Sequence, residues 1–430
     1  MSSYRQQLVK AAAASFRRGP DRLHGCTFYR DWTRYPALNY GAHLGGIGGP
    51  ITFTRASAAT RINGAGLLET LAPDVPAFDF DPISRLCRGL RVGGARTNLA
   101  AGSNIMTTLT AAAMSWVTVD DVFGDPGSAR LATKFTENAY GFVSKTVAGT
   151  FAAGTTYTVS AVVKKTNARY IAFRAQHNYS TGRADIRYDW DTDTFLLSRA
   201  GTTVPSVTGG SAEAGSGFRK IWLTYTLAGD YTGLTLYIAS SSTAQAYVDG
   251  TQNAEGDAFV ISDVQVEVGP FPSSLIRTPG GGAATRSADI PILSGIENYV
   301  TDAGTIYVEW ARGGLGQSGF PRIFDTSRGY IYSASANAAQ IGWRRYPMSE
   351  NSVTGTTGLG PHRSALAWDS SGAIGYLDGK ASSRVGFSDP MTGALYLGCR
   401  ATGDYLFGYL RRVAIYPRRL TVQQLNQLIT

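Results

Sequence analysis

The feature that most constrains this chain is a series of short segments in which apolar and polar residues alternate. Between residues 100 and 275 such segments include "TYTVSAVVKK", "YIAFRAQ", "KIWLTYTLAG" and "DAFVISDVQVEVG", bounded by Gly, Asn, Asp or Ser. A second series, including "GTIYVEWARG", "RSALAWDS" and "AIGYLDGK", follows residue 295. Alternation with a period of two indicates half-buried strands, and many short strands at this spacing are typical of sandwiches. The sequence therefore predicts an all-β protein with two jelly-roll β-sandwiches in series.

Composition agrees with this prediction, and one segment departs from it. Gly is abundant with 51 residues, and Tyr outnumbers Phe by 23 to 18, a mixture that favours short strands joined by tight turns. The departure is "YRQQLVKAAAASFRR" over residues 4–18, where Leu8, Ala12 and Phe16 recur at helical spacing before "RRGP" ends the run. The aromatic, Gly-rich stretch that follows has no clean period. We expect a short N-terminal helix followed by an extended arm.

These patterns divide the chain into five parts. They are an N-terminal helix and arm over 1–50, a linking segment over 51–100, a first sandwich over 101–275, a Pro/Gly-rich hinge over 276–294 and a second sandwich over 295–430.

The stretch "GYLRRVAIYPRRL" near the end of the chain, residues 408–420, contains four arginines and raises the question of a nucleic-acid site. Strict alternation predicts a strand that Pro417 closes, followed by a short helix with a capping box of Thr421 and Gln424. One face of the strand would carry Tyr409, Arg411, Val413 and Ile415, and the other Leu410, Arg412, Ala414 and Tyr416. The arginines would thus lie in a strand and its exit turn, and not on a recognition helix.

Charge and cysteine content exclude several other classes. The net charge is +9, but no run of five like charges occurs, whereas nucleic-acid binders concentrate their charge on one face. The cysteines Cys26, Cys87 and Cys399 are odd in number and far apart, so neither a disulfide framework nor a zinc site is indicated. No secretory core and no apolar stretch of membrane-spanning length is present. We therefore expect neither nucleic-acid binding nor membrane insertion.

Catalytic motifs are equally scarce. Glycosidic hydrolysis normally needs two carboxylates at a defined separation, and Glu309 in "YVEWARG" has no acidic residue two positions away. The nucleophile pattern GxSxG is absent, and "DWDTD" at 189–193 lacks the Gly and Glu positions of a calcium loop, so it indicates a hairpin turn. We predict no catalytic residues, no enzymatic activity and no cofactor. A structural Ca²⁺ in either sandwich stays open, as does a pair of carboxylates brought together by folding.

Residues 53–100, "FTRASAATRINGAGLLETLAPDVPAFDFDPISRLCRGLRVGGARTNLA", resemble the "FTRAS-AT … PRFDYDP … GLLIE-ARTNL" segment of bacteriophage head-spike or tail-fibre proteins. Where that family often carries Glu before Ala-Arg-Thr-Asn, Gly93 and Gly94 stand here. Residues 300–430 resemble a concanavalin A-like (laminin-G-like) jelly roll, and the block ending "DAFVISDVQVEVGPFPSSLI" is similar to a carbohydrate-binding-module sandwich. The matching positions of the first segment include Phe53, Thr54, Arg55, Ala56, Ser57, Thr60, Phe78, Asp79, Asp81, Pro82, Gly89, Leu90, Ala95, Arg96, Thr97, Asn98 and Leu99.

This resemblance implies a structural component of a phage or gene-transfer particle, assembled in the host cytoplasm and located on the virion. It implies other virion proteins and host surface polysaccharide as partners, and a homo-oligomeric, often trimeric, state. The N-terminal part would dock to the particle through Tyr4, Leu8, Phe16, Phe28, Trp32 and Tyr35. Two alternatives remain: a purely architectural decoration protein without a receptor, and a hydrolase that degrades capsule or lipopolysaccharide.

Aromatic and arginine side chains supply candidate sugar contacts, because aromatic faces stack on pyranoses and Arg forks bind hydroxyls or acidic groups. We predict one platform at Tyr188 and Trp190, which lie two residues apart. The strongly apolar strands around Trp222 and Trp368 instead predict core positions for those two tryptophans. The second predicted platform consists of Trp343 with Arg344, Arg345 and Tyr346.

Overall fold

The computed structural model describes residues 25–40, 47–103, 109–135, 140–242, 254–278, 281–315, 319–333, 340–345, 351–355, 358–386 and 390–428. Within them nearly every regular element is a strand, and the one α-helix, α2 (Val422–Gln427), has six residues. The predicted all-β class is therefore confirmed. The helix predicted over residues 4–18 lies outside the described residues. No helix in the described part is long and apolar enough to cross a membrane.

One sandwich combines strands from both ends of the chain, and we call it the terminal sandwich. Among the described residues its two sheets have eight and seven strands. The larger sheet has the order β29 (Lys380–Ala381), β28 (Gly372–Leu377), β27 (Pro361–Asp369), β22 (Gly304–Arg312), β31 (Gly408–Tyr416), β6 (Cys87–Val92) and β5 (Phe78–Phe80), and β1 (Phe28–Asp31) also pairs with β31. The smaller has the order β2 (Ile51–Thr54), β21 (Ile290–Leu293), β30 (Leu395–Leu397), β23 (Arg322–Asp325), β24 (Gly329–Ser333), β25 (Gln340–Arg345) and β26 (Asn351–Thr354).

The aromatic arm is part of this sandwich. Strand β1 pairs with β31, so that Phe28 lies opposite Ile415, and Phe28 and Trp32 are fully buried in the core. Tyr35 is half-buried against the same core. The prediction that Phe28 and Trp32 dock to a particle is therefore wrong, because their side chains already fill the interior of their own chain. The other predicted docking residues, Tyr4, Leu8 and Phe16, lie outside the described residues.

The second sandwich, the inserted sandwich, is formed by residues 110–268. In its described part each of its two sheets has six strands, and aliphatic side chains such as Val159 and Ile221 fill its core. One sheet has the order β16 (Val207–Gly215), β17 (Phe218–Thr226), β12 (Thr156–Lys165), β19 (Ala258–Val268), β10 (Ala129–Lys134) and β9 (Met114–Val119). The other has the order β15 (Thr194–Ala200), β14 (Arg183–Asp189), β13 (Tyr170–Gln176), β18 (Tyr231–Ser241), β11 (Phe142–Phe151) and β8 (Thr110–Ala112).

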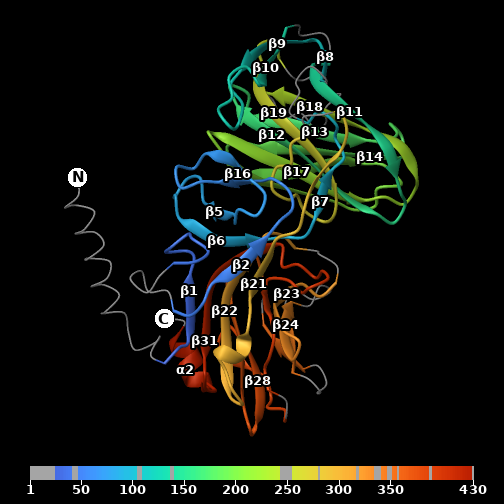
Figure 1. The fold of residues 1–430 in the computed structure, drawn as a ribbon. Coiled ribbons are helices and arrows are strands. Elements are labelled where there is room, and N and C mark those ends of the chain that lie inside the picture. Colours follow the sequence, from blue (N-terminus) through green and yellow to red (C-terminus); the bar gives the residue numbers. More distant parts are fainter. Residues whose placement is uncertain are drawn as a thin grey trace, which may run out of the picture.

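A two-stranded stem connects the sandwiches. The chain leaves the terminal sandwich on β7 (Arg96–Asn98) and returns on β20 (Ala284–Arg286), and these strands pair antiparallel. The hydroxyls of Thr97 and Thr285 lie 2.8 Å apart across the pair. The strand pattern did not reveal this arrangement, in which one sandwich is inserted between two strands of the other. Figure 1 shows the green and yellow strands of the insertion stacked above the blue, orange and red strands of the terminal sandwich.

A buried charge cluster lies at the base of the stem. Asp289 is fully buried and accepts hydrogen bonds from Arg55 Nη1 at 3.3 Å, Arg286 Nη1 at 2.8 Å and the amide of Gly93 at 2.9 Å. Arg55 also donates to the carbonyls of Ser57 and Ala72. One carboxylate thus connects the segment before the insertion to the segment after it.

Two further positions of the segment 53–100, Asn98 and Gly89, have contacts that fix the local structure. Asn98 is fully buried, accepts from the amides of Ala100 and Val266, and donates to the carbonyls of Val264 and Ile276. Gly89 has a φ of 122°, and a side chain there would overlap the backbone of Leu410. Arg55, Gly89 and Asn98, three positions of the phage resemblance, therefore each have a structural role in this chain.

The strand predicted over residues 408–416 is present as β31, but its side chains do not divide between the two faces as strict alternation predicts. Glu309 pairs with Arg412 and Trp310 with Leu410, so Arg411 is the extra residue of a β-bulge. Leu410 therefore joins Val413 and Ile415 in the core, contrary to strict alternation. The predicted capping box is present: Thr421 Oγ1 accepts from the amide of Gln424, whose side chain accepts from the amide of Thr421.

Replacing Asp289 by Asn should destabilise the terminal sandwich by about 3–5 kcal/mol, because two buried guanidinium groups would lose their shared counter-charge. Urea unfolding followed by tryptophan fluorescence measures this loss. The exposed Asp302→Asn provides the control, with an expected change below about 0.5 kcal/mol. Equal unfolding midpoints for the two variants would contradict the role assigned to Asp289.

Candidate functional site

The structure does not form the first predicted sugar platform. Tyr188 is buried with 1% of its surface exposed, and its hydroxyl donates to Asp193 Oδ1 at 3.0 Å. Burial, together with the bond to Asp193, raises the pKa of Tyr188 to about 12. Trp190 is half-buried and meets the Tyr188 ring edge-on, with 5.0 Å between ring centroids. Both rings pack against the core of the inserted sandwich, so the pair presents no shared flat face to solvent.

The second predicted platform is also not formed. Trp343 is fully buried in the terminal sandwich, where its indole packs against Gly375 of β28 so closely that a Cβ there would overlap it. Arg344 is half-buried and lies opposite Tyr330, and Arg345 lies opposite Gly329. Tyr346 falls outside the described residues. The basic neighbours of Trp343 therefore do not surround an accessible indole.

A cleft between the two sandwiches has the geometry of a ligand site. Its volume is about 580 Å³, which falls in the range of small-ligand pockets. The terminal sandwich contributes Arg91 and Arg411, the hairpin of β3 (Ala59–Ile62) and β4 (Leu68–Leu71) contributes Arg61, and the inserted sandwich contributes Lys220 and Trp222. Sequence analysis assigned none of these residues to a site, because the cleft exists only where the two sandwiches meet.

Local structure explains the arginines on the terminal side. Arg88 and Arg91 belong to β6, and they form ion pairs with Asp81 at 2.8 Å and Asp79 at 3.0 Å. Tyr409 donates from its hydroxyl to Asp79 Oδ2 at 3.2 Å. Burial opposes the charged form of Arg88, but Tyr409 and Asp81 outweigh it and raise its pKa. These carboxylates hold the guanidinium groups in fixed positions.

The bulge in β31 also serves the cleft. Because Arg411 is the extra residue, its side chain leaves the alternation of the strand and lines the cleft. Its Nε donates to Glu309 Oε1 at 2.9 Å, and its Nη1 donates to the carbonyl of Arg88 at 3.3 Å. A departure from strict alternation thus positions one of the cationic groups.

Alternation in β17 positions the opposite wall. Ile221 and Leu223 face the core of the inserted sandwich, whereas Lys220 and Trp222 lie on the outer face of the sheet. Trp222 lies opposite Gly210 in β16, and its indole covers that glycine so closely that a Cβ there would overlap the ring. Trp368 is buried as predicted, but the core position predicted for Trp222 is wrong, since Trp222 is half-buried and lines the cleft.

Residues 269–278, which we call the strap, contribute a third wall of the cleft through residues 271–275. The strap crosses the outer face of the sheet that contains β17, and buried polar side chains of β19 hold it there. The amide of Ser273 donates to Glu267 Oε2 at 2.9 Å, and the amide of Ile276 donates to Gln265 Oε1 at 2.7 Å. Thr60 of the hairpin donates to the carbonyl of Leu275 at 2.8 Å. The strap therefore contacts the inserted sandwich and the hairpin at once.

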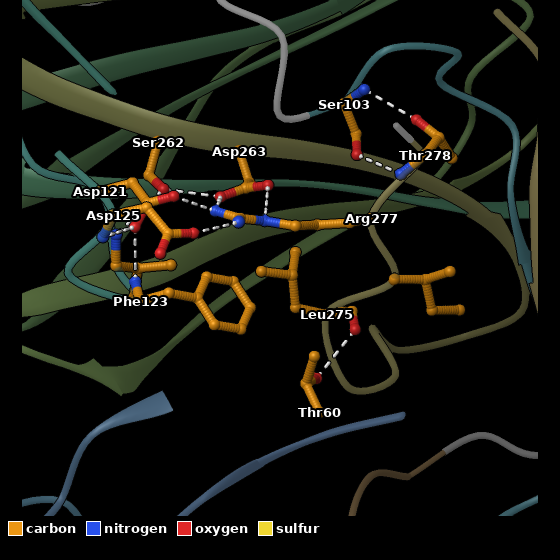
Figure 2. Close-up of polar contacts among 12 residues, drawn as sticks. Thr60, Ser103, Asp121, Phe123, Asp125, Ser262, Asp263, Leu275, Arg277 and Thr278 are labelled. Carbon is orange, nitrogen blue, oxygen red and sulfur yellow. Dashed lines mark hydrogen bonds and ion pairs between the residues drawn. The ribbon is translucent and has the colours of Figure 1, made fainter. Parts of the chain in front are cut away.

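Arg277 anchors the far end of the strap, as Figure 2 shows. Its guanidinium forms ion pairs with Asp121, with Asp125 at 3.3 Å and with Asp263 at 3.1 Å, and lies 3.9 Å from the centroid of the Phe123 ring. Asp121 and Asp263 are buried, and burial raises the pKa of Asp263 against the opposing effect of Arg277. Among the described residues no group of three His, Cys, Asp or Glu side chains has the arrangement of a metal site.

Lys220 differs from the arginines of the cleft. Its Nζ donates to the carbonyl of Ser273 at 2.9 Å, and within the described residues it forms no ion pair with a carboxylate. Burial in the cleft and the charge of Arg91 lower its pKa to about 8, although Glu267, Asp263 and Asp79 act in the other direction. The ammonium group thus lacks a counter-ion of its own at the cleft wall.

No protein-family model matches this chain, and no curated protein matches it. Among solved structures, the CBM40 module of the Ruminococcus gnavus IT-sialidase, bound to α2,3-sialyllactose, is 15% identical, with a TM-score of 0.26; the match covers 30% of this chain and 83% of that one. Domain 4 of AbnA, a GH43 arabinanase from Geobacillus stearothermophilus, in complex with arabinotriose, is 13% identical, covering 35% and 77%, with a TM-score of 0.27.

Trypanosoma rangeli sialidase in complex with sialic acid is 8% identical, with a TM-score of 0.25; the match covers 74% of this chain and 62% of that one. At TM-scores this low, none of these similarities carries an argument about function. The phage resemblance of residues 53–100 has no counterpart among these matches.

Replacing Arg277 by Leu should cost about 3–5 kcal/mol of stability at pH 7, because Asp121 and Asp263 would be buried without a cation. Burial would then raise the pKa of Asp263 without the opposing effect of Arg277, so protonation of that carboxyl should restore part of the lost stability as the pH falls toward 4. Urea unfolding of the variant and the native protein at both pH values measures the difference. Asp125→Asn, at an exposed carboxylate, should change stability little at either pH. A deficit independent of pH would argue against this pairing.

Proposed function

We propose that the protein is a non-enzymatic structural component of a phage or phage-like particle, a tail fibre or head spike, that binds host surface polysaccharide. The observation that carries the binding part is the cleft of about 580 Å³, in which Trp222 and several cationic side chains meet. An aromatic face beside charged hydrogen-bond donors is the combination that sugar recognition uses. The particle part is supported by the resemblance of residues 53–100.

The proposal that the protein is not an enzyme is supported by the contacts of the two carboxylates in the cleft. Asp79 and Glu213 line the cleft, and each is held in an ion pair, Asp79 by Arg91 and Glu213 by Arg219. Asp79 additionally accepts from the amide of Ile62 at 2.8 Å. Glycoside hydrolysis needs two carboxyl groups that face the glycosidic bond, whereas these two side chains contact arginines of the cleft wall.

Of the predicted docking residues, Phe28 and Trp32 leave the proposal, since they belong to the core of the terminal sandwich. Tyr4, Leu8, Phe16 and the half-buried Tyr35 stay in it. We propose that this N-terminal part attaches to other virion proteins and that copies of the chain associate with one another.

The polysaccharide proposal can be tested with the purified full chain on a panel of bacterial capsules and lipopolysaccharides. We expect retention of at least one polysaccharide, with no reducing ends released during prolonged incubation. Trp222→Ala should weaken that retention about tenfold, since stacked aromatic contacts contribute about 1–1.5 kcal/mol. Trp190→Ala provides the control outside the cleft. A panel without any retained polysaccharide, or with released reducing ends, would refute the proposal, as would a purified particle shown by mass spectrometry to lack the chain.

A further inference from the structure

We propose that the cleft selects a saccharide that carries a carboxylate, and that Lys220 is the residue that recognises the acidic group. This inference rests on the proposed polysaccharide binding and narrows it to one chemical class.

The first argument is the charge of the lining. Among the described residues that line the cleft, seven are basic and two are acidic. Several carboxylates that balance the arginines, among them Glu69, Asp81 and Glu309, are not part of the lining. They hold the guanidinium groups from behind and leave the positive charge toward the cleft. A lining of this kind favours an anion over a neutral ligand.

The second argument is the donor capacity that remains. Arg61 uses Nε for Glu69, at 2.6 Å, and Arg411 uses Nε and Nη1 for protein acceptors. Within the described residues, the two Nη groups of Arg61 and the Nη2 of Arg411 form no hydrogen bond or ion pair with the protein. Planar guanidinium groups bind carboxylates through paired N–H donors. Arg61 and Arg411 therefore both retain N–H donors for an acidic group in the cleft.

The third argument is Lys220 itself. Lys220 is half-buried at the cleft wall, and its ammonium group has one protein acceptor, the carbonyl of Ser273. Arg91 lies close enough to disfavour its charge, and the acids that favour it, Glu267, Asp263 and Asp79, are already bonded to other groups. A ligand carboxylate beside Nζ would supply the missing counter-ion. Lys220 and Trp222 lie two residues apart on the same face of β17, so one sugar ring can stack on the indole while its carboxylate reaches the lysine.

Binding to oligogalacturonate and to its methyl ester, measured by isothermal titration calorimetry with the full chain, tests this inference. The ester has the same sugar chain as the acid, but its carboxyl groups carry methyl groups in place of negative charges. We expect the acid to bind at least about tenfold more tightly than the ester, and Lys220→Met to remove most of that preference. Lys220→Arg should retain it. Lys164→Met, at an exposed lysine of β12 outside the cleft lining, should leave both affinities unchanged.

The pH dependence of the affinity provides a second test, because a lysine with only a structural role would not change it. Because burial in the cleft lowers the pKa of Lys220 to about 8, the affinity for the acid should fall between pH 7 and 9 in the native chain and stay flat in Lys220→Met. Thermal unfolding of each variant shows whether it is folded.

Equal affinities for acid and ester, or an acid preference that survives in Lys220→Met, would overturn the inference while leaving polysaccharide binding intact. No binding of either probe, combined with retention of only neutral polysaccharides on the panel, would also overturn it. If no polysaccharide of any class is retained, the proposed function itself fails.

Discussion

Asp289 is the point on which the arrangement of this molecule depends. A carboxylate buried between Arg55 and Arg286 links the chain before the insertion to the chain after it. A buried charge is tolerated only when it is paired and fully hydrogen-bonded, so this cluster can form in few geometries. The stem that rises from it fixes where the inserted sandwich begins and ends. The cleft is a consequence, because it is bounded by strands of both sandwiches and by the strap that crosses between them.

The joint also gives a physical meaning to the segment that resembles phage appendage proteins. Arg55 and Asn98 are positions of that resemblance and have contacts at the joint, whereas Asp79 and Gly89 contact β3 and β31. Asn98 uses both ends of its amide to connect the stem to the inserted sandwich and the strap. A segment under such constraints would keep its residues whatever ligand the rest of the molecule binds.

Sequence patterns correctly predicted the features that depend on contacts between residues close together in the chain. Alternation located most strands, and the Thr421 capping box was visible because its two bonds join residues three positions apart. The failures concern contacts between distant segments. Trp343 is buried because Gly375, in another strand, leaves room for its indole, and Arg411 faces the cleft because of a bulge opposite Glu309. One signal for the cleft was present in the segment "KIWLTYTL". Lys220, Trp222 and Thr224 lie on one face of this strand, and the core residues lie on the other. A large aromatic residue on the outer face indicates that another segment of the chain could pack over that face.

A crystal structure of the full chain with bound trigalacturonate tests the central claim most directly. The account predicts a sugar ring against the Trp222 indole, with its carboxylate in hydrogen-bonding distance of Lys220 Nζ. Sugar bound on an outer face away from both sandwich walls, with the cleft left empty, would contradict it.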